Sequence, residues 1–484
     1  MKRQNRLLLT LSAFSLISAA LVGCGQKGSD SGKVVVTFGH TFGDKIETAL
    51  ESKIKDFKRL IKEHEGVDVE VELSYLGGYN DVFNKINTYF TDGTIPTMTV
   101  AYPDAVADFI HSFGKKYVVN FDDYINDPEV TFGTEAYLGD TEDVDDFVQR
   151  FLEEGRQFTI EGTYSIPFLK STEVMIYNLD AAVEAMKFYN PQVVEQGRVK
   201  EVIASFSWDE LMDFARVAWE HKDDVSDVLE YPVFYDSDSN MFITHMYQED
   251  YDYSSVVNGK GHIDFNDGES GPNYTGALGL LDEYKQLHAE HLLTTKGTVG
   301  TYASDYFKKG KCLFSIGSSG GGGYTFPDAG EFNSEVCLAP CKNETPYYIC
   351  QGASIAFLRN PTFSNEKNDL NLKYAWKFLK YITSKNVNTF ICLKGSEGYV
   401  PVRTSCYSTE TYLDFIQQGD NYAKLSMVVT DEINGRYINN AVFTGSAALR
   451  NAVGAAVTQL LTGSMSTAKA ALDAAINEAN KYIV

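Results

Sequence analysis

The chain has 484 residues, of which 44% are hydrophobic and 22% are charged. This composition is that of a globular protein with sizeable cores, and the length suggests about three domains of roughly 150 residues. The formal net charge of −24 argues against nucleic-acid binding, which needs clustered Lys and Arg, and against electrostatic attachment to anionic lipid.

The first 24 residues are predicted to be an export signal. Lys2, Arg3 and Arg6 form a positive region, followed by an apolar run over residues 7–22, which is shorter than the about 20 residues of a membrane span. The ending "LVGC" resembles the lipobox of bacterial lipoproteins, in which the cysteine, here Cys24, becomes the lipidated first residue. An ordinary signal peptide that contains a cysteine is the alternative. We expect residues 1–23 to be removed and residues 24–33 to form a polar, lipidated tether.

Strands and helices are predicted to alternate directly after the tether. The runs at 34–38, 67–73 and 96–102 have the pattern of buried or half-buried strands. Between them, apolar residues recur at helical spacing over 46–61 and 82–90. This order predicts an α/β domain with a largely parallel sheet.

The rest of the chain continues the mixture of helices and strands. Pro167 interrupts a pair of predicted strands within residues 162–180. Ser207, followed three residues later by a glutamate, predicts a capping box at the start of a helix. Amphipathic helices are predicted over 371–384 and 466–484.

Four consecutive glycines, Gly320 to Gly323, follow a strand-like stretch and two serines. No Lys-Ser or Lys-Thr pair follows them, which excludes a P-loop. The run could be a hinge, a crowded turn or a set of free backbone amides that bind an anion, and the residues alone leave these open.

The cysteines other than Cys24 all lie in the second half of the chain. In an exported protein six cysteines can form disulfides, and sequence does not choose among their pairings. Cys337 and Cys341 lack the CxxC spacing and nearby histidine of a zinc site, so we expect no metal and no cofactor. The six are Cys312, Cys337, Cys341, Cys350, Cys392 and Cys406.

Eight segments in register resemble the extracellular solute-binding proteins of ABC importers, in the carbohydrate-binding family that includes maltose- and glycerol-3-phosphate-binding proteins. They are "GGYNDVFNKI", "YSIPFLKSTEVMIYN", "SWDELMDFA", "FKKGKCLFSIGSSG", "CQGASIAFL", "AWKFLKYITS", "SEGYVPVRTSCY" and "LLTGSMSTAKAALDAA". The resemblance implies an α/β, two-lobed periplasmic-binding-protein-like fold with hinge strands at Pro167 and Phe168, at the glycine run and at Gly352. The implied N-terminal lobe is 34–167 plus 314–356, and the C-terminal lobe is 168–313 plus 357–484.

The resemblance also implies the ligand-contacting residues and the partners. An arginine supplies two planar donors, serines and glycine amides supply neutral donors, and tyrosines pack on apolar carbons. We expect a monomer that binds a small carbohydrate-class molecule and ABC importer membrane subunits, held by its lipid on the outer face of the cytoplasmic membrane. The ligand-contacting residues that the resemblance implies are Tyr79, Asp104, Ser171, Asn240, Ser318, Ser319, Gly320, Gly352, Tyr399 and Arg436.

Two departures leave the ligand open. The segment from Phe188 to Phe206 is an addition, and the region 234–253 lacks the tryptophans that often stack sugars. A sugar or oligosaccharide is expected, with glycerol-3-phosphate or another polyol phosphate as the alternative.

A secreted glycosidase is the more distant alternative, because it needs two carboxylates across one cleft. The acidic clusters, such as Asp143 to Asp146, have the pattern of solvated helix faces, so we expect no catalytic residues. Residues 236–240 begin like a calcium loop, but Met241 stands where that loop needs glycine.

Overall fold

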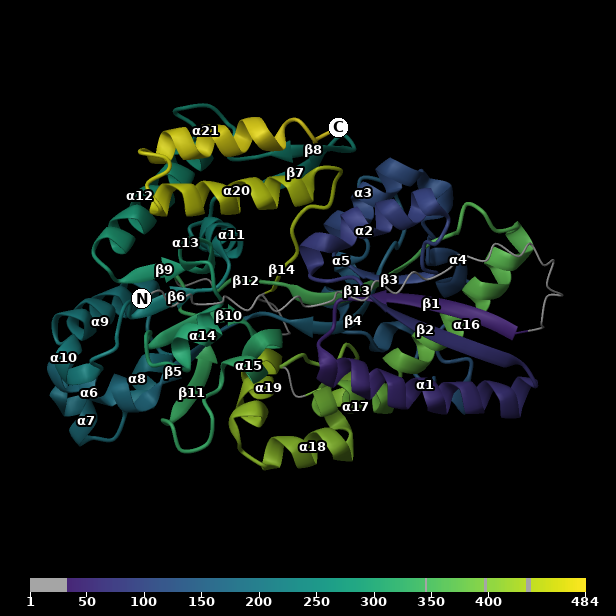
Figure 1. Cartoon of the computed structure of the whole chain (residues 1–484), viewed down its shortest axis with the longest axis horizontal. Coiled ribbons are helices and arrows are strands. Elements are labelled where there is room, and N and C mark those ends of the chain that lie inside the picture. The colour runs from purple at the N-terminus through teal and green to yellow at the C-terminus, as the bar shows by residue number, and fades with distance from the viewer. Residues whose placement is uncertain (1–32, 344–345, 396–397, 432–436) are drawn as a thin grey trace, which may run out of the picture.

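The computed structural model describes residues 33–343, 346–395, 398–431 and 437–484. Within these ranges the chain forms two α/β lobes, each built on a five-stranded sheet, which lie side by side (Figure 1). The predicted two-lobed α/β architecture is therefore confirmed. The predicted signal peptide, tether and Cys24 lie outside the described residues.

The first sheet has the strand order β2-β1-β3-β13-β4. β1 is parallel to β2 and β3, whereas β13 is antiparallel to both β3 and β4. The strands predicted at 34–38, 67–73 and 96–102 are β1, β2 and β3. The bounds are β1 (Lys33–His40), β2 (Asp68–Tyr75), β3 (Met98–Ala101), β4 (Ile166–Ser171) and β13 (Gln351–Phe357).

Helices from both ends of the chain pack around the first sheet. The predicted apolar stripe of α1 is buried throughout, and α16, far along the chain, packs on β1 and α1. The helices are α1 (Asp44–Glu65), α2 (Tyr79–Asp92), α3 (Pro103–Phe113), α4 (Asp122–Ile125), α5 (Gln149–Glu154), α16 (Asn365–Thr383), α17 (Lys385–Gly395) and α18 (Glu410–Gln417), and 3-10 turns lie at Lys115–Tyr117, Ala136–Leu138, Val144–Asp146 and Thr404–Ser408.

The second sheet has the order β11-β5-β10-β6-β9. β5 is antiparallel to its neighbours β10 and β11, and β10, β6 and β9 run parallel. Every residue of β5 is buried, as expected for an interior strand of a sheet that is covered on both faces. The bounds are β5 (Glu173–Asn178), β6 (Val233–Tyr235), β9 (Leu293–Thr295), β10 (Phe314–Ser318) and β11 (Ser334–Leu338).

The helices of the second lobe include the predicted capping box. The Ser207 hydroxyl accepts from the backbone N–H of Glu210, whose carboxylate accepts from Ser207 N–H. The helices are α6 (Leu179–Tyr189), α7 (Pro191–Glu195), α8 (Val199–Ala204), α9 (Trp208–Glu220), α10 (Lys222–Val225), α11 (Asp238–Gln248), α12 (Pro272–Ala289), α13 (Lys296–Val299), α14 (Ala303–Phe307), α15 (Gly322–Thr325), α19 (Asn421–Asp431), α20 (Ser446–Leu461) and α21 (Ala468–Ala479). Two short strand pairs complete it, β7 (Ser254–Val257) with β8 (Lys260–Ile263) and β12 (Tyr348–Ile349) with β14 (Tyr437–Ile438).

The strand pairings divide the chain differently from the predicted lobe boundaries. Residues 314–338 were expected in the first lobe, but β10 and β11 flank β5 in the second sheet. Residues 365–395 were expected in the second lobe, but α16 and α17 pack on β1 and α1 of the first lobe. The first crossing lies at Thr172 rather than at Pro167, because Pro167 still pairs with β13.

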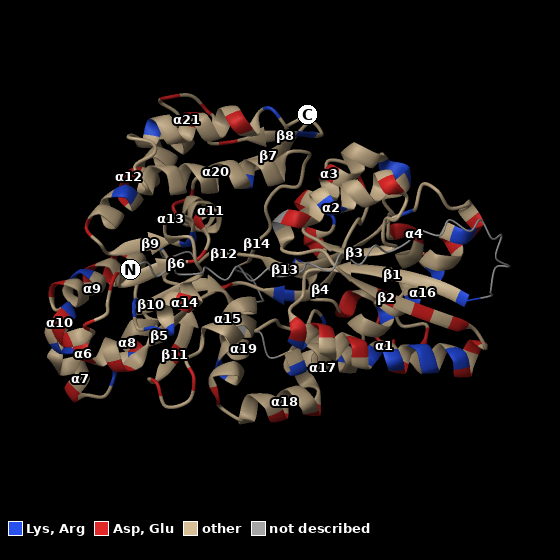
Figure 2. Cartoon of the chain, in the orientation of Figure 1, with Lys and Arg blue, Asp and Glu red and all other residues tan. Residues whose placement is uncertain are grey.

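Charged residues lie mainly on the outer helices of both lobes, α1 among them, while the strands of the second sheet are mostly uncharged (Figure 2). None of the helices in the described ranges combines the length and the apolar character needed to cross a bilayer.

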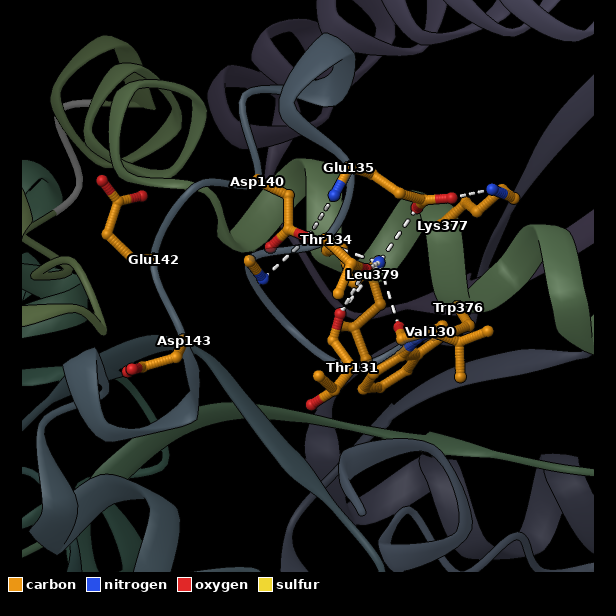
Figure 3. Close-up of polar contacts among 12 residues, drawn as sticks. Val130, Thr131, Thr134, Glu135, Asp140, Glu142, Asp143, Trp376, Lys377 and Leu379 are labelled. Atoms are coloured by element: carbon orange, nitrogen blue, oxygen red, sulfur yellow. Dashed lines mark hydrogen bonds and ion pairs between the residues drawn. The ribbon is translucent and has the colours of Figure 1, made fainter. Parts of the chain in front are cut away.

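Polar contacts join the loop before α5, which carries Val130, Thr134 and Asp140, to α16 (Figure 3). The buried Lys380 of α16 makes most of them. The Lys380 ammonium donates to Val130 O at 3.0 Å, Thr131 O at 3.1 Å and Thr134 Oγ1 at 2.9 Å. It also pairs with Glu135 at 3.0 Å and with Asp140 at 3.3 Å. Asp140 is buried and in turn accepts from Gly133 N–H at 3.0 Å. This ionic cluster joins the loop to the helix beside the aromatic contact between Phe132 and Trp376, whose ring centroids lie 4.8 Å apart.

Lys380→Met should lower the free energy of unfolding by about 3–5 kcal/mol, because it leaves Asp140 buried without its cation. Urea unfolding measures the change. Lys373→Met, an exposed lysine on the same helix, is the control and should change it by no more than about 0.5 kcal/mol. Equal stabilities of the two variants would contradict a structural role for the cluster.

Candidate ligand cleft between the lobes

A cleft of about 1140 Å³ separates the two lobes, and residues of both line it. The first lobe contributes the turn after β1, the end of β2, the start of α2 and Tyr102 before α3. The second lobe contributes the ends of β6, β9 and β10 and one face of α20. Loops that follow the carboxyl ends of parallel strands meet here, the usual place for ligands in open α/β sheets.

Seven of the ten predicted ligand residues line this cleft, although they come from distant parts of the chain. This is where the structure places them, and their contact with a ligand stays a prediction. The seven are Tyr79, Ser171, Asn240, Ser318, Gly320, Gly352 and Tyr399.

The other three predicted ligand residues are not among those that line the main cleft. Asp104 lines a smaller pocket that adjoins the cleft. Ser319 is fully buried; its N–H donates to Thr172 O at 2.7 Å and its hydroxyl accepts from Thr172 N–H at 3.4 Å, so both polar groups are used within the protein. Arg436 lies outside the described residues.

The glycine run forms a closely packed part of the cleft wall. A Cβ at Gly320 would lie 2.7 Å from the Tyr399 ring, and one at Gly322 would lie 2.4 Å from Leu425. None of Gly320 to Gly323 has a positive φ, so close approach, rather than an unusual backbone conformation, requires glycine at Gly320 and Gly322, whereas a Cβ at Gly321 would meet nothing within 4 Å. The run connects β10 to α15 within the second lobe and is not itself a crossing between the sheets.

Six tyrosines line the cleft. Tyr79 and Tyr102 lie with ring centroids 4.4 Å apart, and Tyr399 lies against Gly320. Tyr75, Tyr302 and Tyr324 are 59%, 54% and 46% exposed, unusually open for such large rings. Tyrosine presents an apolar face and a polar tip, a combination that suits ligands with both C–H faces and hydroxyls.

Carboxylates and cations balance among the described residues that line the cleft. Three of each are present: Asp236, Asp238, Asp305, Lys296, Lys308 and Arg450. Two of the carboxylates also accept hydrogen bonds from neighbouring loops of the second lobe. Asp238 accepts from Thr295 Oγ1 at 2.7 Å and from Gly297 N–H at 3.1 Å, and Asp236 accepts from Ala303 N–H at 3.0 Å. Burial raises the pKa of both.

The cleft cations and four of the six cleft tyrosines were not predicted from the sequence. Arg450 is the most informative of these, because it is the only charged residue of α20, "SAALRNAVGAAVTQLL". A single arginine within an otherwise uncharged helix could have indicated a ligand-binding residue from the sequence alone. Its guanidinium lies 5.8 Å from the centroid of the Tyr102 ring, so it spans from the second lobe to the first.

A buried glutamate lies beneath the cleft wall. Glu173, the first residue of β5, is fully buried, and its Oε2 accepts from Tyr235 OH at 2.5 Å and Thr244 Oγ1 at 3.2 Å. A hydrogen bond with the Asn240 side chain also favours the charged carboxylate. Burial raises the pKa of Glu173 from 4.5 to about 7, against the opposing effect of these donors.

The described residues contain no group of three or more His, Cys, Asp or Glu side chains that could hold a metal ion. The six cysteines from Cys312 to Cys406, whose disulfide pairing the sequence leaves open, are free thiols in the structure.

The sequence matches the family model of bacterial extracellular solute-binding proteins over residues 54–417. No curated protein matches it. Among solved structures, the GacH receptor of Streptomyces glaucescens, solved unliganded and with acarbose, is 18% identical with a TM-score of 0.65, over 92% of this chain and 97% of the other.

Two further structures have the same fold. UgpB from Mycobacterium tuberculosis, in complex with glycerophosphocholine, is 16% identical with a TM-score of 0.66, over 93% and 98% of the two chains. An ABC substrate-binding protein from Listeria monocytogenes, in complex with cycloalternan, is 15% identical with a TM-score of 0.67, over 93% and 98%. The predicted periplasmic-binding-protein-like fold is thereby confirmed.

Replacing Glu173 by Gln should flatten the pH dependence of stability between pH 4.5 and about 7. The folded protein binds the Glu173 proton more tightly than the unfolded chain, so this group's contribution to stability falls as pH rises through that window. Glu173→Gln removes this contribution and should be at least as stable as wild type above pH 7.

Thermal unfolding from pH 4.5 to 8 provides the measurement. Glu195→Gln, at an exposed position on α7, controls for removal of a carboxylate and should retain the wild-type slope. A slope in Glu173→Gln that matches wild type would show that Glu173 is not protonated in the folded protein near neutral pH.

Proposed function

The chain belongs to the family of bacterial extracellular solute-binding proteins, and we propose that it captures a neutral sugar or oligosaccharide and delivers it to an ABC importer. The observation that carries the proposal is the chemistry of the cleft: six tyrosines, many neutral hydroxyl and amide groups, and charges that sum to zero among the described lining residues. Such a wall matches a ligand with hydroxyls and apolar C–H faces better than one with a net charge.

The proposed role is binding without chemical change. A ligand that contacts both walls of the cleft favours the closed arrangement of the lobes by its greater affinity for that arrangement. The single connecting residue Thr172 between β4 and β5 supports such a hinge. Closure around the solute is then the state that an importer distinguishes from the empty protein. We infer that the protein acts as a monomer, since one chain contributes both walls.

The structural relatives support a carbohydrate without identifying it. Two of the three described above were solved with oligosaccharide-type ligands and one with a phosphodiester. A phosphate ester would need a surplus of cations, and Lys296, Lys308 and Arg450 are matched by three carboxylates. The neutral ligand is therefore favoured over glycerol-3-phosphate.

Neutral saccharides should raise the melting temperature of the protein. A ligand at 100 times its Kd stabilises the folded state by about 2.7 kcal/mol. Thermal-shift screening of mono- to tetrasaccharides at 10 mM, with glycerol-3-phosphate in parallel, measures this. Small-angle X-ray scattering with the strongest binder should show a smaller radius of gyration.

Two results would contradict this prediction in different ways. Tight glycerol-3-phosphate binding with no response to sugars would reassign the ligand class. A saccharide that is chemically altered on incubation would reassign the protein to an enzyme.

We infer that the lipid anchor on Cys24 holds the protein at the outer face of the cytoplasmic membrane. The supporting pattern is the charged start, the short apolar run and "LVGC". Cys24→Ala should move the protein from the membrane fraction to the soluble fraction or leave it unprocessed, because one missing anchor removes the acyl chains. Metabolic labelling with palmitate and fractionation measure this, and a Cys24→Ala protein that still carries label would contradict it.

A further inference from the structure

A small pocket of about 50 Å³ adjoins the main cleft. Tyr102 and Arg450 line both spaces, so the two are continuous around these side chains. The pocket lies between the start of α3 in the first lobe and the first turns of α20 in the second. A water-sized group needs about 10–15 Å³ on this scale, so the pocket admits about four such groups.

Two polar atoms of this pocket have no partner within the described residues. The Tyr253 side chain is only 3% exposed, and its hydroxyl makes no hydrogen bond there. The Asn440 carbonyl Oδ1 is buried and unpartnered in the same way. The Tyr253 ring is fixed by Phe242 and Phe265, at centroid distances of 6.4 and 5.6 Å. Buried polar groups in folded proteins are normally satisfied, so this pair indicates an external partner.

Arg450 and Asp104 add one charge of each sign to the same pocket. Neither forms an ion pair within the described residues; Arg450 lies over the Tyr102 ring, and Asp104 Oδ1 accepts only from the adjacent Ala105 N–H at 2.7 Å. Glu154 also lines the pocket, but it is paired with Lys170 at 2.6 Å and accepts from Ser354 Oγ at 3.2 Å. The free groups are thus two donors, Arg450 and Tyr253, and two acceptors, Asp104 and Asn440.

We propose that this side pocket is a subsite for two neighbouring hydroxyl groups of one saccharide unit, while the rest of the saccharide occupies the main cleft. A hydroxyl both donates and accepts, and only a group of that kind satisfies donors and acceptors together. A phosphate or carboxylate accepts only and would meet the carboxylates of Asp104 and Glu154. The inference rests on the proposed function and deepens it.

The position of the subsite predicts a dependence on ligand length. A single sugar unit is larger than the side pocket, which admits only about four water-sized groups, so it binds in the main cleft without filling the subsite. A longer or branched saccharide can fill both around Tyr102, so its affinity should include contacts that a monosaccharide lacks. The protein should therefore prefer an oligosaccharide to its constituent sugar.

The test is calorimetric titration of wild type, Tyr253→Phe and Asp104→Asn with two neutral series, glucose to maltotetraose and glucose to cellotetraose. Loss of one neutral hydrogen bond should raise the Kd of the longest binder by about 2- to 10-fold in Tyr253→Phe. Loss of a charge-assisted bond should raise it by about 10- to 100-fold in Asp104→Asn. The Kd of the shortest binder should stay within about twofold. Tyr247→Phe is the matched control, because Tyr247 lines neither space.

A second readout separates a ligand contact from a structural role. An unpartnered buried hydroxyl does not stabilise the fold, so Tyr253→Phe should melt, without ligand, at the wild-type temperature or above it. A lower melting temperature of the free variant would overturn the inference, because the hydroxyl would then be satisfied within the protein.

The binding results also distinguish this inference from the proposed function. Saccharides that bind all variants as they bind wild type, or that lose affinity equally at every length, would overturn the subsite and leave the function standing. If no member of either series binds wild type, both the proposed ligand class and the subsite fail.

Discussion

The crossing from β4 to β5 is the constraint on which the cleft depends. A single residue, Thr172, separates β4, an edge strand of the first sheet, from β5 of the second sheet. Its hydroxyl donates to Ile349 O at 3.0 Å and its carbonyl accepts from Ser319 N–H at 2.7 Å. The segment before β13 and the glycine run are therefore both attached to the crossing point.

Lys170, two residues earlier, anchors the same crossing from the first lobe. Its backbone exchanges hydrogen bonds with Val400 at 3.2 and 2.8 Å, and its buried ammonium pairs with Glu154 at 2.6 Å. Gly352 has a φ of 93°, and a Cβ there would lie 2.3 Å from Leu169 O, so only glycine permits this approach. Three distant segments thus meet at one point, and the predicted residues Ser171, Gly352 and Tyr399 line the cleft because of it.

The sequence predicts the local elements well and the long-range pairings poorly. The strands and helices up to β3 follow from periodicity, because each stripe is read within about 20 residues. The placement of β10 depends on its pairing with β5, more than 130 residues away, which no local pattern contains. The cleft residues came from the resemblance, which aligned "SSG" and "GGYN" but offered no motif for Arg450. The motif also does not reveal that Ser319 is fully buried and hydrogen-bonded to the backbone of Thr172.

The distribution of charge explains how a strongly acidic protein can have a balanced binding cleft. The net charge is −24, and acidic side chains lie on both helices and loops around the outside of the two lobes (Figure 2). At physiological ionic strength charges separated by more than about 8 Å are largely screened, so the outer carboxylates contribute little inside the cleft. The negative potential of the outer surface does not affect the approach of a neutral ligand, whereas it would repel an anion. The surface charge and the paired charges of the cleft therefore favour the same class of solute, and recognition rests on hydrogen bonds and tyrosine faces at short range.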